Sequence, residues 1–286
     1  MILLVDSGST KSEWLLVTKS GEYVNIYNTI GFNPVFQSSD FIENEIKENG
    51  GLMGIADSVD QVFYYGAGCS GESYQKVVFT ALTRIFRKAK INVDHDIMAA
   101  AYASYEGTPC ICCILGTGSN SAYFDGREVY SVNAGLGYIL GDEGSGSYFG
   151  KKLLAAFLYK QLPDAVLSEL EAEFHLDRAG IIKMVYQEPR ANVYLASFTR
   201  FIAKHRDLPV FEQMLYEGMR EFLHIHVCCF PEYKEVKTHF VGSIAFYFSD
   251  SIRRAAADLG IEVGQIMKSP IHRMLDYHIQ YFFQNA

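Results

Sequence analysis

The 286-residue sequence has no excess of basic side chains. It carries 25 Lys and Arg against 33 Asp and Glu, which gives a formal net charge of −8. Proteins that bind nucleic acids normally present a stripe of basic residues to the phosphate backbone. The composition therefore argues against a nucleic-acid partner.

Long apolar runs are also missing. No stretch approaches the roughly 20 consecutive apolar residues that a transmembrane helix needs. The apolar opening MILLV lacks the basic residues that begin a signal peptide. With 49% hydrophobic and 20% charged residues, we expect a globular, cytoplasmic protein with no membrane partner.

Cysteine is scarce and its spacing is poor for metal binding. Cys112-Cys113 and Cys228-Cys229 are adjacent pairs inside apolar runs, and the sequence has no CxxC pair. Structural zinc sites use other spacings. We predict reduced, buried thiols, and we keep an iron–sulfur cluster shared across a dimer as the alternative.

Two turns rich in glycine and hydroxyl side chains each follow an apolar segment. The first is Asp6–Lys11, DSGSTK, and the second is Gly116–Asn120, GTGSN. Turns without bulky side chains let backbone N–H groups converge on an anion such as phosphate. An acid at a strand end, such as Asp6, can hold hydrated Mg²⁺. An ordinary hairpin turn is the alternative for each motif taken alone.

The rest of the pattern predicts a mixed α/β chain that changes domain at Gly107-Thr108-Pro109. Each half begins with strand, turn and strand, which suggests an internal duplication. A helix capped by Ser39 or Asp40 should run through about Glu48, where Gly50-Gly51 ends it. The other expected helices cover 72–90, 97–105, most of 163–229, a segment from Ser243 to about Leu259, and a last segment that begins at Pro270. A further long helix should follow the glycine-rich run 135–146 and reach about residue 161.

A competing motif lies in the loop Gly66–Gly71, GAGCSG, which is a literal GxGxxG between a strand and a helix. With Asp94 further along, it matches a dinucleotide-binding fingerprint. However, the preceding segments predict a hairpin meander instead of parallel strands. The dinucleotide hypothesis also leaves both hydroxyl-rich turns unexplained, so we interpret this loop as a strand-to-helix turn.

Four motifs in order resemble a known family. DSGST, LGTGSN and FVGSIA follow the order of the two phosphate motifs and the adenosine motif of the superfamily of sugar kinases, heat-shock ATPases and actin. The run NAGLGYILGDEGSG resembles the N-acetylglucosamine kinases and the related BadF/BcrA-type ATPases. The resemblance implies two RNase H-like (actin-like ATPase) α/β domains with a nucleotide cleft between them. They would span 1–107 with a C-terminal helix at about 271–286, and 108–270 with a helical insertion.

The same resemblance implies roles for individual residues. Asp96 would be the catalytic acid–base residue, with a simple helix cap as its alternative. Asp6 would orient the magnesium ion. Sugar would contact Asn33, Thr117, Gly135, Asp142 and Gly146. The nucleotide would contact Ser9, Thr10, Lys11, Gly116, Thr117, Gly118, Ser119, Asn120, Gly242 and Ser243.

The implied activity is ATP- and Mg²⁺-dependent phosphorylation of an amino sugar, with N-acetylglucosamine as the first choice. An ATPase that activates a dehydratase and a non-catalytic sugar sensor stay open as alternatives, and a homodimer stays open as an assembly. One departure concerns the last helix, which carries His272-Arg273 where the family pattern calls for small residues near the nucleotide.

Overall fold

The computed structural model describes residues 1–133 and 135–283, which form two compact units. The first unit contains Met1–Pro109, Phe124–Val129 and the C-terminal segment from Ser269. The second contains Cys110–Tyr123 and Tyr130–Lys268. None of the helices described is long and apolar enough to cross a membrane.

The first unit is built on a five-stranded sheet in the order β3-β2-β1-β4-β5. Strands β1, β2 and β3 form an antiparallel meander, and β4 and β5 continue the sheet parallel to β1. The strands are β1 Ile2–Ser7, β2 Lys11–Val17, β3 Tyr23–Ile30, β4 Gln61–Gly66 and β5 Lys90–His95.

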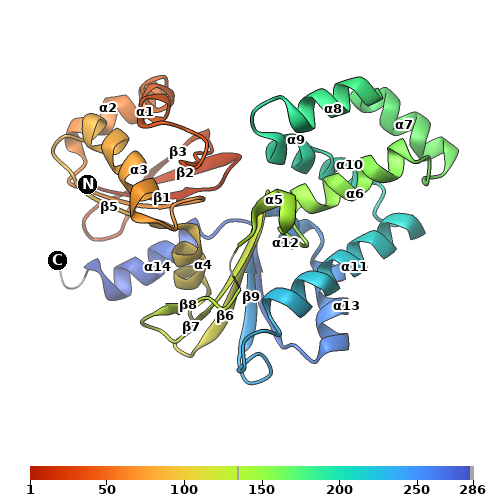
Figure 1. Ribbon diagram of the computed structural model, residues 1–286. Coiled ribbons are helices and arrows are strands. Elements are labelled where there is room, and N and C mark those ends of the chain that lie inside the picture. The colour runs from red at the N-terminus through yellow and green to blue at the C-terminus, as the bar shows by residue number, and fades with distance from the viewer. Residues whose placement is uncertain (134, 284–286) are drawn as a thin grey trace. The chain divides into compact units, whose positions relative to one another are not determined.

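Helices cover both faces of this sheet (Figure 1). Alternate residues such as Leu3 and Val5 pack with α1, α2 and α3, whereas Leu4 and Leu15 pack with α4 and α14. These helices are α1 Ser39–Lys47, α2 Gly50–Ile55, α3 Glu72–Ile85, α4 Asp96–Ser104 and α14 Ile271–Tyr281, with a 3₁₀ turn at Ala56–Ser58. The end of β1 therefore lies between two apolar layers.

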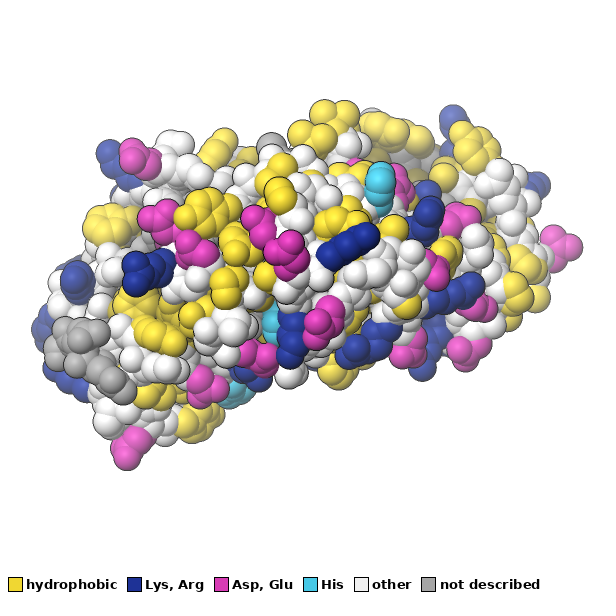
Figure 2. All heavy atoms as spheres, turned by 90° about the horizontal axis from the view of Figure 1, so that it is seen from below, with side chains coloured by type: hydrophobic (Ala, Val, Ile, Leu, Met, Phe, Trp, Pro, Cys, Tyr) yellow, Lys and Arg dark blue, Asp and Glu magenta, His cyan; other side chains and the backbone are white. Residues whose placement is uncertain are grey.

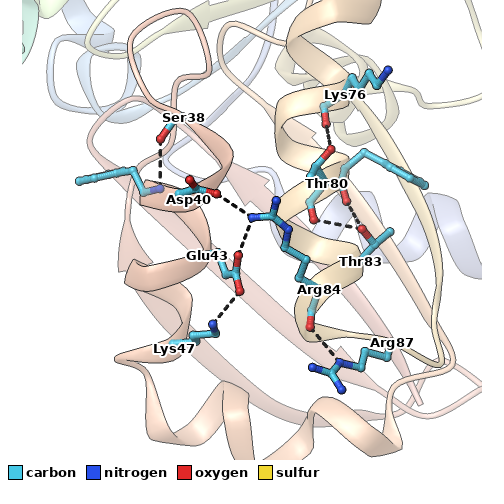
Figure 3. Close-up of polar contacts among 11 residues, drawn as sticks. Ser38, Asp40, Glu43, Lys47, Lys76, Thr80, Thr83, Arg84 and Arg87 are labelled. Atoms are coloured by element: carbon cyan, nitrogen blue, oxygen red, sulfur yellow. Dashed lines mark hydrogen bonds and ion pairs between the residues drawn. The ribbon is translucent and has the colours of Figure 1, made fainter.

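Polar contacts join α1 to α3 on the outer surface (Figure 3). Arg84 Nη1 lies 2.7 Å from Asp40 Oδ1 and 2.8 Å from Glu43 Oε2, and Lys47 Nζ lies 2.6 Å from Glu43 Oε1. Exposed pairs of this kind contribute about 0–1 kcal/mol each. The buried apolar faces of α1 and α3 therefore dominate their attachment to the sheet.

One predicted helix end in this unit is wrong, and so is the role predicted for Gly50-Gly51. Helix α1 ends at Lys47, close to the predicted Glu48. Gly50-Gly51 starts α2, because the Asn49 side chain accepts from Leu52 N and caps a new helix. The helix predicted over 72–90 ends at Ile85. Phe86 leaves helical geometry there, and its side chain is fully buried in the core beneath the sheet.

The second unit repeats the strand order of the first. Its sheet runs β10-β9-β6-β7-β8, so the first strand of the unit is again central, and β9 and β10 extend the sheet in parallel. The predicted duplication thus corresponds to a shared topology. The strands are β6 Cys110–Leu115, β7 Ser119–Phe124, β8 Val129–Tyr130, β9 Lys237–Val241 and β10 Val263–Met267.

Helices account for most of the rest of this unit, and α6, α11 and α13 share one large apolar core with β6 and β9. The predicted helix from Ser243 is interrupted at Phe248, which is buried and contacts Phe149. The short α5 was not predicted. The helices are α5 Gly137–Leu140, α6 Gly146–Leu158, α7 Asp164–Phe174, α8 Arg178–Tyr186, α9 Ala191–Ser197, α10 Thr199–Lys204, α11 Pro209–His226, α12 Ser243–Tyr247 and α13 Ser249–Leu259.

The unexpected Arg273 has a structural partner. Its Nε donates to Ala103 O at 3.1 Å, and its Nη2 lies 3.3 Å from Glu106 Oε1, so it ties α14 to the C-terminal end of α4. On the face drawn in Figure 2, acidic and basic side chains are intermixed with apolar ones.

Candidate functional site

The turn Ser7–Lys11 is held rigidly at the end of β1. Gly8 N donates to Lys11 O at 3.0 Å, and the buried Ser7 and Ser12 hydroxyls lie 2.7 Å apart. Gly31 packs directly on this turn, because a Cβ added there would lie 2.1 Å from Gly8 O. A larger residue at Gly31 would displace the turn backbone.

Three carboxylates gather beside this turn. Asp6 and Glu13 are register partners on β1 and β2, and Asp96 begins α4 on the same side of the sheet. Burial, followed by the charges of Glu13 and Asp96, raises the pKa of Asp6 from 3.8 to about 7, and Lys11 opposes the rise. Near neutral pH, Asp6 can therefore release its proton and bind a cation in its place.

Asp96 occupies the first turn of α4, and its N-cap, His95, makes no capping bond through its side chain. Burial raises the pKa of Asp96, while His95 and the backbone N–H groups of Ile97 and Asp96 itself lower it. The carboxylate thus interacts with backbone N–H groups at the start of the helix, although His95 and not Asp96 is the N-cap residue. The same burial makes the carboxylate more basic than an exposed aspartate.

Asn33 is brought to the first turn. Its Nδ2 donates to Ser9 Oγ at 3.4 Å, and its Oδ1 accepts from Val35 N at 3.1 Å. The side chain lies between the phosphate-type turn and the Gly66–Gly71 loop, because a Cβ on Gly68 would meet Asn33 Oδ1 at 2.2 Å. The structure therefore groups Asp6, Ser9, Thr10, Lys11, Asn33 and Asp96 within the first unit.

The second turn, Gly116–Asn120, joins β6 to β7 and is bonded to the start of α6. Gly116 N donates to Gly118 O at 3.0 Å, Gly146 N donates to Gly116 O at 2.8 Å, and Ser147 N donates to Thr117 O at 3.0 Å. The geometry of this turn is that of a hairpin, as the alternative interpretation of the motif predicted. These bonds also place the glycine-rich run 141–146 against the turn.

Asp142 lies on this second turn. Its Oδ1 accepts from Ser119 N at 3.4 Å, and a Cβ on Gly118 would lie 2.9 Å from Oδ2. Burial raises the pKa of Asp142, while Ser119 N–H and Lys151 lower it. The backbone at Asp142 is left-handed, with φ of 59°, a conformation that is costly for most residues and is tolerated by Asp and Asn.

Gly242 approaches the second turn from the β9 end. Its φ is 121°, and a Cβ there would lie 2.3 Å from Leu115 O, so this position requires glycine. Ser243 follows as the first residue of α12. Gly135 has open space around its Cβ position, and its predicted sugar contact stays a prediction.

Sequence reasoning missed Glu13, Lys151 and the pair Glu143–His226. Glu13 Oε1 lies 3.0 Å from Lys11 Nζ, and Glu143 Oε2 lies 2.8 Å from His226 Nε2. His226 is buried with this acid as its partner, which is typical of a structural histidine. The alternation of β2 could have signalled Glu13, because it faces the same side as Leu15.

Each turn, taken by itself, can accommodate phosphate oxygens. Ser119 Oγ is buried, and among the described residues it has no hydrogen-bond partner. Lys11 is more than half exposed beside the first turn. Within the described ranges, no three His, Cys, Asp or Glu side chains are grouped to hold a metal ion. A hydrated Mg²⁺ ion needs only one or two carboxylates besides phosphate oxygens, and Asp6 could supply one of them.

The adjacent cysteines of β6 do not fit a cluster. All six are free, and Cys112 and Cys113 are fully buried in β6. Burial raises the pKa of both thiols well above the ordinary value. Iron–sulfur ligation across a dimer needs thiolates at a surface. This pair therefore does not supply the ligands that a dehydratase activator would use.

Two RNase H-like sheets with a glycine–hydroxyl turn at the first strand of each are the arrangement of the actin-like ATPases, which confirms the expected fold class. The model of the BadF/BadG/BcrA/BcrD ATPase family matches residues 5–205. The chain belongs to this family, as its motifs predicted.

Solved structures agree with this assignment. A candidate N-acetylglucosamine kinase from Porphyromonas gingivalis is 34% identical, with a TM-score of 0.91 over 98% of this chain and 99% of that one. A second candidate N-acetylglucosamine kinase, from Chromobacterium violaceum, is 16% identical, with a TM-score of 0.64 over 96% and 98%. A ROK family glucokinase from Streptomyces griseus, in complex with glucose and AMPPNP, is 13% identical, with a TM-score of 0.54 over 96% and 98%. No curated protein matches the chain in sequence.

Proposed function

We propose that the protein is an ATP- and Mg²⁺-dependent kinase that phosphorylates a hydroxyl of an amino sugar, with N-acetylglucosamine as the first candidate. The observation that carries this proposal is the similarity to the Porphyromonas gingivalis protein along almost the whole of both chains. The two turns and their acids support it independently, because each turn has a carboxylate beside it, Asp6 in one case and Asp142 in the other.

In this mechanism, Asp96 accepts the proton of the attacking sugar hydroxyl. The new O–P bond forms as the bond between the γ-phosphorus and the ADP oxygen breaks, and ADP leaves with the electron pair. The raised pKa of Asp96 brings its basicity closer to neutral pH, which favours proton acceptance in the transition state. Mg²⁺ would neutralise charge on the phosphates, with Asp6 oriented toward its water shell.

The remaining residues bind and orient. The turn residues Ser9, Thr10 and Lys11 and the second turn, Gly116–Asn120, are proposed to contact phosphate oxygens. Asn33 and Asp142 are proposed to hydrogen-bond sugar oxygens, and Gly242 and Ser243 to lie by the adenosine. Holding the reactants in line is the larger part of catalysis in phosphoryl transfer.

A coupled assay for ADP release tests the proposal. It would use ATP and Mg²⁺ with N-acetylglucosamine, N-acetylmannosamine, glucosamine and glucose in turn. We expect ADP release that depends on sugar and is fastest with an N-acetylated sugar. ADP release that no sugar stimulates would contradict the kinase proposal. Sugar binding without any ATP turnover would support a sensor instead.

A further inference from the structure

The Gly66–Gly71 loop has no role in the function proposed so far, although its sequence is a literal GxGxxG. A dinucleotide fold would place this loop in a sheet whose strands are all parallel. Here the loop does lie in a parallel unit, β4–α3–β5, but the sheet opens with the antiparallel meander β1–β2–β3. The loop is instead bonded to the end of β1, because Ala67 N donates to Ser7 O at 2.8 Å. It therefore lies beside the Ser7–Lys11 turn.

Gly68 touches the side-chain amide of Asn33. Its φ is +75°, and a Cβ at this position would lie 2.2 Å from Asn33 Oδ1 and 2.9 Å from Asn33 Cγ. Side chains do not tolerate contacts this short, so any residue other than glycine would push the amide away. Glycine is therefore required here for two reasons: the backbone is left-handed, and the Asn33 amide occupies the space of a Cβ.

Other contacts fix which way this amide points. Asn33 Oδ1 accepts from Val35 N at 3.1 Å, and Nδ2 donates to Ser9 Oγ at 3.4 Å. The backbone is held as well, because Asn33 N donates to Gln37 Oε1 at 2.6 Å. Nδ2 carries two hydrogens, and the Ser9 contact uses one of them. The second N–H can therefore donate to a ligand.

We infer that Gly68 is a positioning residue that fixes the Asn33 amide so that its Nδ2 group donates to an acceptor oxygen of the sugar. This inference rests on the proposed function. It specifies that Asn33 acts as a donor, so the group it meets on the sugar is a hydroxyl or acetamido oxygen. The glycine motif thereby serves recognition of the sugar and not of a dinucleotide.

The test compares Gly68→Ala with Gly260→Ala. Gly260 has a φ of +67° with no atom within 4 Å of its Cβ position, so its variant carries the left-handed strain without the clash. In calorimetry, Gly68→Ala should weaken N-acetylglucosamine binding about ten- to a hundredfold and leave ATP binding within about twofold. Gly260→Ala should leave both unchanged. Unchanged sugar affinity in folded Gly68→Ala would overturn the inference.

A double-mutant cycle with Asn33→Ala separates positioning from general damage. Once the amide is gone, adding Gly68→Ala should change sugar affinity by less than about twofold. An equal loss in both backgrounds would show that Gly68 does not act through Asn33. If Gly68→Ala alone unfolds, the pair Asn33→Ala/Gly68→Ala should fold, and its Tm should fall below that of Asn33→Ala by no more than Gly260→Ala lowers the Tm of the wild type, because only the left-handed strain remains once the clashing amide is removed. Failure to fold, or a larger fall in Tm, would overturn the inference.

A last readout does not depend on sugar. The ¹H–¹⁵N signal of the Asn33 side-chain amide can be identified by its loss in Asn33→Ala. It should move in Gly68→Ala and stay in place in Gly260→Ala, and an unmoved signal would refute positioning. If the signal moves but the wild-type protein binds none of the sugars tested, the proposed function fails, and the role of the amide as a sugar donor fails with it.

Discussion

Asp6 and Glu13 face each other across the antiparallel strands β1 and β2, next to the turn that carries Lys11. Burial acts to raise the pKa of Glu13, but hydrogen bonds from Ser269 and Lys11 outweigh it and lower this pKa. Glu13 thus stays ionised and its charge helps to keep a proton on Asp6, whose pKa is about 7. Of these two neighbouring acids, Glu13 carries a fixed negative charge, whereas Asp6 can gain or lose a proton near neutral pH.

The protonation of Asp6 predicts a dependence of stability on pH. The native pKa is raised, so below pH 3.8 Asp6 is protonated in both states and costs nothing. As pH rises from 3.8 toward 7, the unfolded chain ionises first and the folded protein loses stability. Asp6→Asn cannot ionise, so its Tm should exceed that of the wild type by at least about 2–4 °C at pH 8. The difference should shrink toward pH 5.

Differential scanning calorimetry of the protein without nucleotide measures this difference. Asp207→Asn is the matched control, because the Asp207 side chain is 99% exposed. A Tm difference between Asp6→Asn and the wild type that is the same at pH 5 and pH 8 would mean that Asp6 ionises normally.

The same substitution should affect catalysis through magnesium. Without its carboxylate, Asp6→Asn cannot orient the water shell of the metal, so we expect turnover to fall about 10²-fold or more, as for other preorganised polar groups at reaction centres. Sugar affinity should stay within about twofold. Titration of the rate with Mg²⁺ checks this, and a wild-type rate and Mg²⁺ dependence would remove Asp6 from the mechanism.

Asn33 and Asp142 should each control sugar affinity. Loss of one buried, partly charged hydrogen bond costs roughly 1.5–3 kcal/mol, or about ten- to a hundredfold in Kd. Asn33→Ala suits the first position. Asp142→Asn suits the second, because Asn also tolerates the left-handed backbone found there. If calorimetry finds normal sugar affinity in both variants, the sugar binds elsewhere.

The burial of the β6 cysteines predicts that the protein holds no iron–sulfur cluster. Protein purified without oxygen should be colourless and contain no stoichiometric iron, because Cys112 and Cys113 are buried in β6. A thiol reagent should modify the half-buried Cys228 and Cys229 before the four buried cysteines. Iron that is retained by the wild type and lost in Cys112→Ala would favour the dehydratase activator.

Features set by local chemistry could be predicted from the sequence. The strand–turn–strand openings and the start of a helix at Asp96 depend on neighbouring residues, and the structure has them at the expected places. The family resemblance was also sufficient to predict the fold class. Helix ends were less predictable, because Phe86 and Phe248 interrupt helices in order to bury their rings in cores formed by distant segments.

In the candidate site, too, local features could be predicted from the sequence and contacts between distant segments could not. The two turns were recognisable as motifs, but their supports are contacts between distant segments, such as Gly31 on Gly8 and Gly242 on Leu115. The strand alternation indicates which side Glu13 faces, but its contact with Ser269 could not be predicted, because Ser269 lies at the other end of the chain. A single sequence does not reveal such pairs, and the structure is needed to find them.

The most direct test follows the phosphoryl group itself by ³¹P NMR, with ATP, Mg²⁺ and N-acetylglucosamine. Wild-type protein should produce a sugar phosphate in step with ADP. Asp96→Asn keeps the shape of the side chain and should fold and bind both substrates, but form the sugar phosphate about 10²–10⁴-fold more slowly, since it lacks the base. No sugar phosphate from the wild type would contradict the kinase account. Formation at nearly the wild-type rate by folded Asp96→Asn would contradict the assignment of Asp96 as the base.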